Sequence, residues 1–374
     1  MEINKIHQGN CLELIKQLED NSVDSIVTDP PYGLSFMGKK WDYKVPSIEI
    51  WKECLRVLKH GGHLLSFSSS RTYHRIACAI EDAGFEIRDQ MQWIYGSGFP
   101  KSLNIGKQID KMQGNEREII GTKIHSQKGV KVAEERGEIG GGAFGVSKEG
   151  DITKGTSEWE GWGTALKPAH EPIVVARKPL SEKNVALNVL KWGTGGINID
   201  ACRVGNRKDT RHGGGKSSEH IQQLNPDVKG YELPQGRFPA NIILDEEVSR
   251  FADWCRFFYC AKASKSERNY GCENLEGKPI DIQQPHNSKD LEERYAMKFK
   301  NNHPTVKPVS LMEYLVKLVS KPKAIILDPF IGSGTTAIAC LKLNRFFIGI
   351  EKEPKYIKIA NARIKPFLEQ QKLI

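Results

Sequence analysis

The sequence has no paired-cysteine pattern and no long apolar run. Its eight cysteines are scattered over 374 residues without a Cys-x-x-Cys pair, so no disulfide framework or zinc finger is indicated. Cys255 and Cys260 have the wrong spacing for zinc and no paired histidines follow them, so we expect no metal site. No signal pattern or membrane-length apolar segment is present, which favours reduced thiols in a cytoplasmic protein without a membrane partner.

A strong excess of one charge is also missing. Lys and Arg number 55 against 46 Asp and Glu, which gives a formal net charge of +9. That excess suits a polyanion such as nucleic acid, although many enzymes with other substrates share it. Hydrophobic residues make up 39% and charged residues 27%, so most of the chain is expected to fold. The length allows one large domain with an insertion, or two domains.

The first hundred residues alternate between strand and helix patterns. Residues 22–29, 63–69 and 86–95 have the β-branched and aromatic content of strands. Residues 47–62 and 71–85 have helical periodicity and end at glycines. Strands separated by helices of this length predict a parallel, doubly wound sheet.

The C-terminal part has the same alternation. Residues 309–320 predict an amphipathic helix, and buried strands are predicted at 324–328 and 345–351. A glycine turn and a helix separate these two strands, and a last helix is expected from about Pro354.

The middle of the chain has a different character. Residues 96–165 are rich in Gly, Lys and Ser and have little periodicity. A strand is predicted at 170–179, and another at 237–245. Between them, 205–236 includes the basic stretch "NRKDTRHGGGK" (206–216), which is typical of a mobile loop. This region is interpreted either as a linker or as an insertion that contacts a partner.

The glycine turn "DPFIGSGTTA" (328–337) fits G-x-G-x-x-G/A, with Gly332, Gly334 and Ala337 at the small positions. Small residues let the backbone approach a ligand at a helix N-terminus. Glu351, at the end of the next strand, suits two ribose hydroxyls. Alone, such a pattern is a weak signal.

Three interpretations of this turn compete. A phosphate-binding P-loop is rejected because no Lys follows the glycines. A nicotinamide-binding unit is the stronger rival, but too little chain follows Glu351 to complete its half-sheet. We therefore predict one sheet built from both chain ends, with its glycine turn at a ligand site. The remaining alternative is a glycine turn that binds no ligand.

The stretch "DPPY" (29–32) follows the strand at 22–29. Asp29 offers a carboxylate, and the carbonyl of Pro30 offers a second acceptor, beside Pro31, which supplies no N–H. Two acceptors match an exocyclic amino group with its two hydrogens. Tyr32 supplies a flat face on which a base could stack. The alternative is a turn that merely ends a strand.

These residues together resemble a known family. The chain is similar to amino-methylating DNA methyltransferases, which methylate adenine at N6 or cytosine at N4 with S-adenosylmethionine. "DPPY" resembles the catalytic motif and "DPFIGSG" (328–334) the cofactor motif, in the permuted order of the β-class. Further matches are "QGNCLELIKQLEDNSVDSIVTDPPYG" (8–33), "HPTVKP" (303–308) and "GIEKEPKY" (349–356). The resemblance covers roughly 1–100 and 237–365.

The resemblance implies an α/β fold: a doubly wound, mostly parallel Rossmann-like methyltransferase sheet assembled from both chain ends. Residues 1–100 would form the catalytic half and 237–374 the cofactor-binding half. The insertion between them, 101–236, would recognise the target.

The resemblance also implies roles for individual residues. The target amino group and base would contact Asp29, Pro30, Pro31 and Tyr32. The methionine part of the cofactor would be surrounded by Asp328, Phe330, Gly332, Gly334 and Thr335. Its ribose and adenine would be bound by Glu351, Asn10 and Cys11, and its pocket completed by Thr305 and Lys307. The family more often has Asp at the position of Asn10.

The expected chemistry is direct methyl transfer to a base extruded from double-stranded DNA. Two acceptors would localise the nitrogen lone pair and aim it at the methyl group. Cytosine C5 methylation needs a thiolate, usually in a Pro-Cys pair, and the sequence has no Pro-Cys dipeptide. Adenine N6 is preferred because D-P-P-Y is commoner in that branch, with N4-cytosine as the alternative.

More distant alternatives are an RNA or protein-glutamine methyltransferase, a nicotinamide oxidoreductase and a DNA-binding module without activity. The sequence shows no nuclease domain, which is compatible with a stand-alone methylase or with the modification enzyme of a restriction pair. Homodimers are common in the β-class group.

Overall fold

The computed structural model describes most of the chain in two compact units. The described residues are 1–35, 38–96, 98, 102–125, 147–208, 235–245, 258–276 and 300–371. One unit comprises Met1–Gly96 and His170–Ile374, and the other Ser97–Ala169. The candidate site lies in the first unit.

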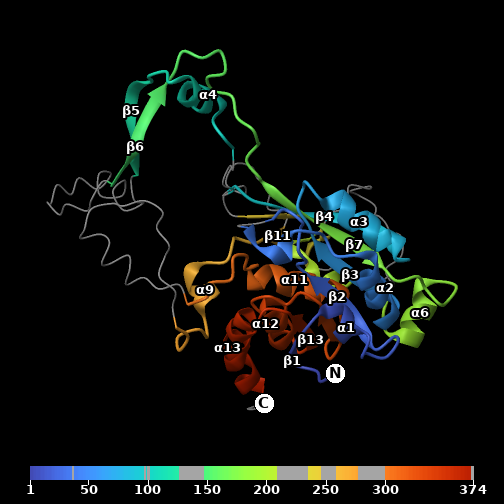
Figure 1. Cartoon of the computed structure of the whole chain (residues 1–374). Helices are drawn as coiled ribbons and strands as arrows, with labels where there is room; N and C mark the ends of the chain where they lie inside the picture. Colours follow the sequence, from blue (N-terminus) through green and yellow to red (C-terminus); the bar gives the residue numbers. More distant parts are fainter. Residues whose placement is uncertain are drawn as a thin grey trace. The chain divides into compact units, whose positions relative to one another are not determined.

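The first unit is built on a nine-stranded sheet in the order β1-β13-β12-β2-β3-β7-β4-β10-β11 (Figure 1). Its strands are β1 (Lys5–Gln8), β2 (Val23–Thr28), β3 (Leu58–Phe67), β4 (Glu86–Ile94), β7 (His170–Arg177), β10 (Ile242–Leu244), β11 (Phe258–Tyr259), β12 (Ile325–Asp328) and β13 (Phe346–Glu351). All neighbours pair in parallel except β7, which is antiparallel to both β3 and β4.

The two chain ends meet in the middle of this sheet, as predicted. β12 pairs with β2 through Ile326 opposite Ser25. β1 pairs with β13, where Gln8 lies opposite Glu351. The carboxyl ends of β2 and β12 therefore lie side by side, at the edge where ligands of parallel sheets bind.

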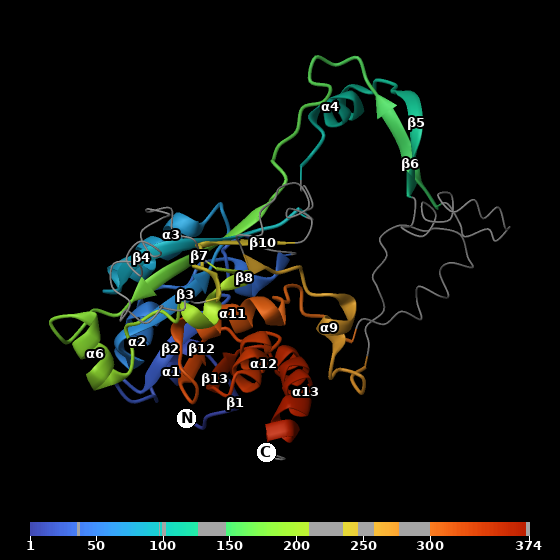
Figure 2. The same ribbon diagram turned by 180° about the vertical axis from the view of Figure 1, so that it is seen from behind.

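Helices cover both faces of the sheet (Figures 1 and 2). One face packs against α1 (Cys11–Ile15), α2 (Ile48–Val57) and α3 (Tyr73–Asp82), and the other against α11 (Val309–Val319), α12 (Thr335–Lys342) and α13 (Pro354–Gln371). The remaining elements of this unit are η2 (Lys40–Asp42), α6 (Val185–Trp192), η3 (Asp200–Cys202), α9 (Lys265–Asn269) and the pair β8 (Val204–Lys208) and β9 (Gln235–Arg237). Only the start of the basic stretch 206–216 falls within the described residues.

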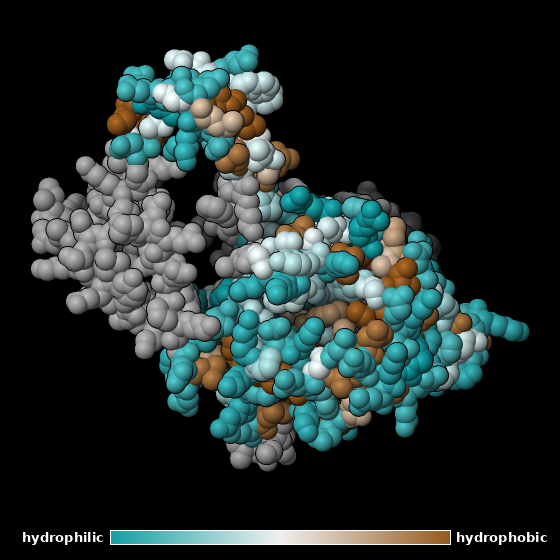
Figure 3. Space-filling model, viewed as in Figure 1, coloured by the Kyte–Doolittle hydropathy of each residue, from teal (hydrophilic) through white to brown (hydrophobic). Residues whose placement is uncertain are grey.

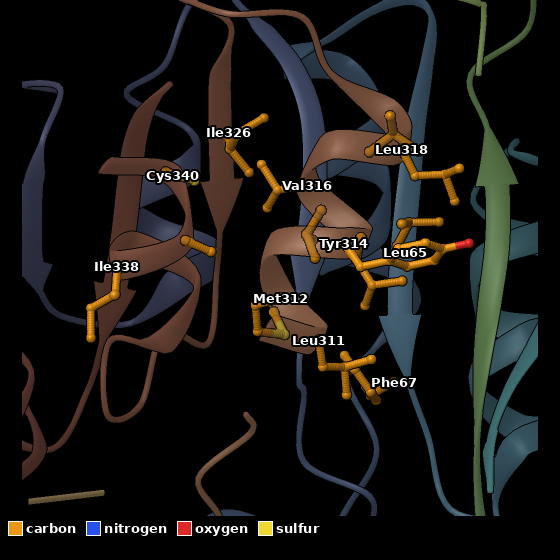
Figure 4. Packing of buried hydrophobic residues seen from close by; sticks show 14 of the residues in the cluster. Leu65, Phe67, Leu311, Met312, Tyr314, Val316, Leu318, Ile326, Ile338 and Cys340 are labelled. Carbon is orange, nitrogen blue, oxygen red and sulfur yellow. The ribbon is translucent and has the colours of Figure 1, made fainter. Parts of the chain in front are cut away.

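The core around α11 fixes that helix against the site-bearing strands. Leu311 and Leu315 of α11 are fully buried, as are Leu65 and Phe67 of β3 and Ile326 of β12. Figure 4 shows side chains of α11 directed at β3 and β12. Burial of each such side chain stabilises the fold by about 1.5–3 kcal/mol.

The antiparallel strand β7 comes from within the predicted insertion. The stretch 101–236 thus contains β7 and α6, which belong to the unit of the sheet. Because β7 runs opposite to its neighbours, its first residues lie at their carboxyl ends: His170 faces Ile94 and Glu171 faces Trp93.

The second unit is small. It contains α4 (Ile105–Gln113) and an antiparallel pair, β5 (Glu118–His125) and β6 (Ser147–Lys154). Arg117 ties the unit together through ion pairs with Asp110 and, at 2.8 Å, with Glu160. Hydrophobic side chains lie exposed on it (Figure 3), among them Leu103, Met112, Ile119, Ile120, Trp159, Trp162 and Leu166.

Among the described helices of either unit, none combines the length and apolar character that a membrane crossing requires.

Candidate active site

The D-P-P-Y turn leaves the central strand β2. All six residues of β2 are buried, and the strand lies between β12 and β3. Asp29 follows directly and Pro30 is buried. The strand therefore holds the turn at the carboxyl edge of the sheet, where the sequence placed it.

A buried carboxylate, Asp42, also fixes the turn. Its Oδ1 accepts hydrogen bonds from the backbone N–H groups of Tyr32 (2.6 Å) and Gly33 (3.0 Å). Its Oδ2 accepts one from the N–H of Leu34 (3.2 Å). These bonds add to the rigidity that the fixed φ angles of Pro30 and Pro31 give the turn. Sequence reasoning missed Asp42, because it lies in the short 3-10 helix η2, whose sequence carries no recognised motif.

Four polar side chains meet above this turn. The hydroxyl of Tyr32 donates to Oδ1 of Asp29 over 2.6 Å. The ammonium of Lys307 lies 2.8 Å from Oδ2 of Asp29 and 2.9 Å from Oε2 of Glu171. The same Oε2 lies 3.2 Å from the Tyr32 hydroxyl. Glu171 was not predicted, although "HEPIVVARKP" was recognised as a strand.

The charge states of this group follow from burial and partners. Burial alone would lower the pKa of Lys307, but the two carboxylates Asp29 and Glu171 outweigh it and raise the pKa above its ordinary value. Burial and the same carboxylates raise the pKa of Tyr32. Lys307 is therefore charged and the Tyr32 phenol is neutral near pH 7. Lys307, assigned from the sequence to the cofactor pocket, contacts the D-P-P-Y residues directly.

The glycine turn begins at a second buried carboxylate, Asp328. Its Oδ1 accepts from the Thr28 hydroxyl (2.6 Å) and the backbone N–H of Phe330 (3.1 Å), and its Oδ2 from the Thr336 hydroxyl (2.5 Å). Burial raises the pKa of Asp328 to about 6, although these three donors oppose the shift. The bond from Thr28 joins the two motifs.

Both glycines of the turn are required by its shape. Gly332 has φ +51°, and a Cβ there would lie 2.8 Å from Nε2 of His303. Gly334 has φ +82°, and a Cβ there would lie 3.1 Å from the Cβ of Ala360. The chain passes so close to its neighbours that a side chain would displace the turn.

His303 packs against this turn as a neutral ring. Burial lowers the pKa of His303 to about 4. Its Nδ1 lies 2.5 Å from the carbonyl of Thr305, which can only accept, so Nδ1 carries the proton and Nε2 faces Gly332 without one. On the other side, Arg363 donates to the carbonyl of Ser333 (2.8 Å) and the hydroxyl of Thr335 (3.0 Å). Neither His303 nor Arg363 was singled out from the sequence.

Glu351 couples the turn to the next strand. Its Oε2 accepts from the N–H of Gly332 (3.1 Å) and its Oε1 from the N–H of Glu353 (2.7 Å). Burial raises the pKa of Glu351. Each oxygen has further lone pairs, so the carboxylate can also accept from a ligand.

The remaining predicted residues lie around the same edge. Asn10 caps α1 by accepting from the N–H of Leu12 (3.0 Å), and the preceding residue bonds to the carbonyl of Glu351. Burial raises the pKa of Cys11 to about 11, so its thiol is neutral. Phe330 makes an edge-on contact with Trp51, with ring centroids 6.5 Å apart.

Comparison with known proteins places the chain in a family. A family model described as DNA methylase, N6_N4_Mtase, matches residues 23–362, and the chain belongs to this family. The name of this family covers both N6 and N4 DNA methylases. The chain is therefore a DNA methyltransferase of the amino-methylating kind.

Particular relatives cover the chain to different extents. Type II methyltransferase M.HindIII of Haemophilus influenzae is 24% identical over 405 residues, which span 97% of this chain and 95% of that protein. Type II methyltransferase M.BglI of Bacillus subtilis is 43% identical over 72 residues, 19% of this chain and 21% of that protein.

Solved structures are similar over nearly the whole chain. The M1.HpyAVI–SAM complex is 19% identical with a TM-score of 0.41, covering 96% of this chain and 98% of that one. PvuII DNA methyltransferase, described as cytosine-N4-specific, is 13% identical with a TM-score of 0.47, covering 98% and 90%.

Proposed function

We propose that this methylase transfers the methyl group of S-adenosylmethionine to N6 of adenine in double-stranded DNA. The observation that carries the proposal is the placement of Asp29 and the glycine turn at adjacent carboxyl ends, joined by the bond from Thr28 to Asp328 (2.6 Å). An amino-group acceptor and a cofactor cradle thus share one edge of the sheet.

The residues at this edge suit the proposed cofactor. Glu351 ends β13 with spare acceptor positions for ribose hydroxyls, beside the exposed Asn10 and the half-buried Cys11 for the adenine. The turn from Phe330 to Thr335 and the neighbouring Thr305 would enclose the methionine part. Once bound, the cofactor supplies an electrophilic methyl on a sulfonium.

Asp29 is proposed to accept a hydrogen from the target amino group. Accepting it weakens delocalisation of the nitrogen lone pair into the ring and orients that lone pair toward the methyl group. The Pro30 carbonyl would accept the second hydrogen, since the prolines of the turn carry no N–H of their own. After transfer the surplus proton leaves the nitrogen, so Asp29 need not be a strong base.

Tyr32 is proposed to stack on the extruded base. Its ring packs against both hydrophobic cores and is half-buried, so its position is fixed. The base leaves the duplex at a cost of a few kcal/mol, which stacking offsets.

Adenine is proposed because the turn reads D-P-P-Y, which is commoner in the N6-adenine branch of the family. S-P-P-Y is commoner in the N4-cytosine branch. The test is to incubate the protein with unmethylated double-stranded DNA and methyl-labelled S-adenosylmethionine, and to identify the labelled nucleoside by mass spectrometry. Label in N6-methyladenosine is expected. Label in N4-methylcytosine would overturn the choice of base, and label in no nucleoside would overturn DNA methylation.

Target recognition is proposed for the insertion, 101–236. In its described part, Lys107 and Lys111 lie exposed one turn apart on α4, and Trp159 and Trp162 are 40% and 57% exposed. Lysines bind phosphates, and exposed aromatic rings contact bases.

A further inference from the structure

Glu171 has no part in the transfer proposed above, yet it contacts the residues that carry it. Its Oε2 lies 2.9 Å from the ammonium of Lys307 and 3.2 Å from the hydroxyl of Tyr32. Its Oε1 accepts from the hydroxyl of the buried Tyr95 over 3.4 Å. The start of the antiparallel strand β7 therefore delivers a second carboxylate beside Asp29.

Both oxygens of Asp29 already have donors. The Tyr32 hydroxyl donates to Oδ1 (2.6 Å) and Lys307 to Oδ2 (2.8 Å). Each carboxylate oxygen has two lone pairs, so a target amino group must either share Oδ1 with the Tyr32 hydroxyl or take the place of that hydroxyl. A phenol has a single proton, so Tyr32 can donate to only one acceptor at a time.

A hydroxyl that gives up Oδ1 to the amino group needs another acceptor. A buried donor left without one costs about 1–3 kcal/mol. Tyr32 cannot avoid this cost by ionising, because burial and the neighbouring carboxylates raise its pKa. Its hydroxyl is within reach of one other carboxylate oxygen among the described residues, Oε2 of Glu171.

We propose that Glu171 is a positioning residue that accepts the Tyr32 hydroxyl while Asp29 accepts the target amino group. The change requires only that the phenolic O–H rotate about the C–O bond, so that it points from Asp29 toward Glu171. No covalent bond forms or breaks, and the tyrosine ring keeps its place for stacking. This inference rests on the proposed function of Asp29.

The surroundings keep Glu171 ready for this role. Tyr95 holds Oε1, so that Oε2 stays directed at Tyr32 and Lys307. Lys307 contacts both carboxylates and offsets their mutual repulsion, so both can act as acceptors together. The hydroxyl therefore has an acceptor on either side.

The test compares Glu171→Met with Glu171→Gln in single-turnover methylation at saturating DNA and S-adenosylmethionine. Methionine has a similar length and no strong acceptor, and we expect the rate constant to fall at least tenfold while the cofactor Kd changes less than twofold. Glutamine retains an acceptor oxygen and is expected to stay within threefold of the wild-type rate. Equal losses in both variants, or a loss in neither, would overturn the acceptor role.

Tyr32→Phe provides the decisive background, because it removes the hydroxyl and keeps the ring. In that background Glu171→Met is expected to slow the reaction less than threefold. An undiminished tenfold loss would show that Glu171 acts only on the surrounding structure, and would contradict the proposal.

Glu86→Gln is the matched control. Glu86 pairs with Arg177 at the other end of β7, 2.6 Å away, so this variant removes a carboxylate from the same strand pair. It should methylate at the wild-type rate. Failure of the wild-type protein to methylate DNA would instead refute the proposed function itself.

Discussion

The hydroxyl of Thr28 donates a hydrogen bond to the carboxylate of Asp328 over 2.6 Å, although 300 positions separate the two residues. Thr28 ends β2 and Asp328 ends β12, and both side chains are buried. The bond fixes the strand before the D-P-P-Y turn against the strand before the glycine turn. We expect both cofactor binding and methyl transfer to depend on this bond.

Thr28→Val should weaken both stability and cofactor binding. Valine keeps the shape of threonine but leaves Asp328 without one of its three donors, which costs about 1.5–3 kcal/mol for a bond to a charged group. Urea unfolding and calorimetric titration with S-adenosylmethionine measure the two effects. Ser25 lies on the same strand as Thr28, and its hydroxyl donates a buried hydrogen bond to the Val319 carbonyl. Ser25→Ala should therefore lower stability without changing cofactor affinity.

The raised pKa of Asp328 predicts a specific pH dependence of stability. Its carboxyl has a pKa of about 6 in the folded chain against an ordinary 3.8. Between those values the folded chain retains a proton that the unfolded chain has lost, so stability falls as pH rises. Relative to Asp328→Asn, the wild type should lose about 2 kcal/mol from pH 4 to pH 7. A difference that stays constant with pH would contradict this account.

Gly332→Ala should disrupt the turn far more than its positive φ alone requires. The added Cβ would lie 2.8 Å from Nε2 of the buried His303. We expect cofactor affinity to fall at least tenfold, measured by calorimetric titration. Gly114→Ala is the control, because Gly114 has φ +72° with nothing within 4 Å of the added Cβ. It should lower stability by about 1 kcal/mol and leave cofactor binding unchanged.

The proposal that the insertion, 101–236, contacts DNA predicts a change in the salt dependence of DNA binding. Lys107→Glu with Lys111→Glu should weaken DNA binding and lower the slope of log affinity against log salt by about 2. Fluorescence anisotropy with labelled duplex measures both. Lys355→Glu with Lys365→Glu on α13 changes the charge equally and should leave the slope unchanged. Equal effects of the two pairs would rule out α4 as a DNA contact.

The sheet could be predicted because its strands carry local signals. β2, β12 and β13 are short, mostly buried runs that end at Thr28, Asp328 and Glu351, and the predicted strands match them within one residue at each end. The helix α2 was predicted too long, as 47–62. It ends at Val57, because Leu58 begins β3 and "LKHGG" is extended there.

Only residues within recognised motifs could be predicted as part of the site. Glu171 reaches the cluster because β7 is inserted antiparallel between β3 and β4, and strand direction is a property of the tertiary fold. His303 and Arg363 contact the glycine turn from separate elements, and no local pattern marks either as its partner. Sequence periodicity reports burial, but it does not report which buried polar groups meet.

The most direct test of the central claim measures methyl transfer and cofactor binding in the same samples of wild-type protein and Asp29→Ala. Asp29 is proposed to act on the target amino group, while the cofactor is proposed to be held mainly by the glycine turn and Glu351. The variant should bind S-adenosylmethionine within a few-fold of the wild type and form N6-methyladenosine at least a hundredfold more slowly. Wild-type rates of N6-methyladenosine formation in Asp29→Ala would contradict the account.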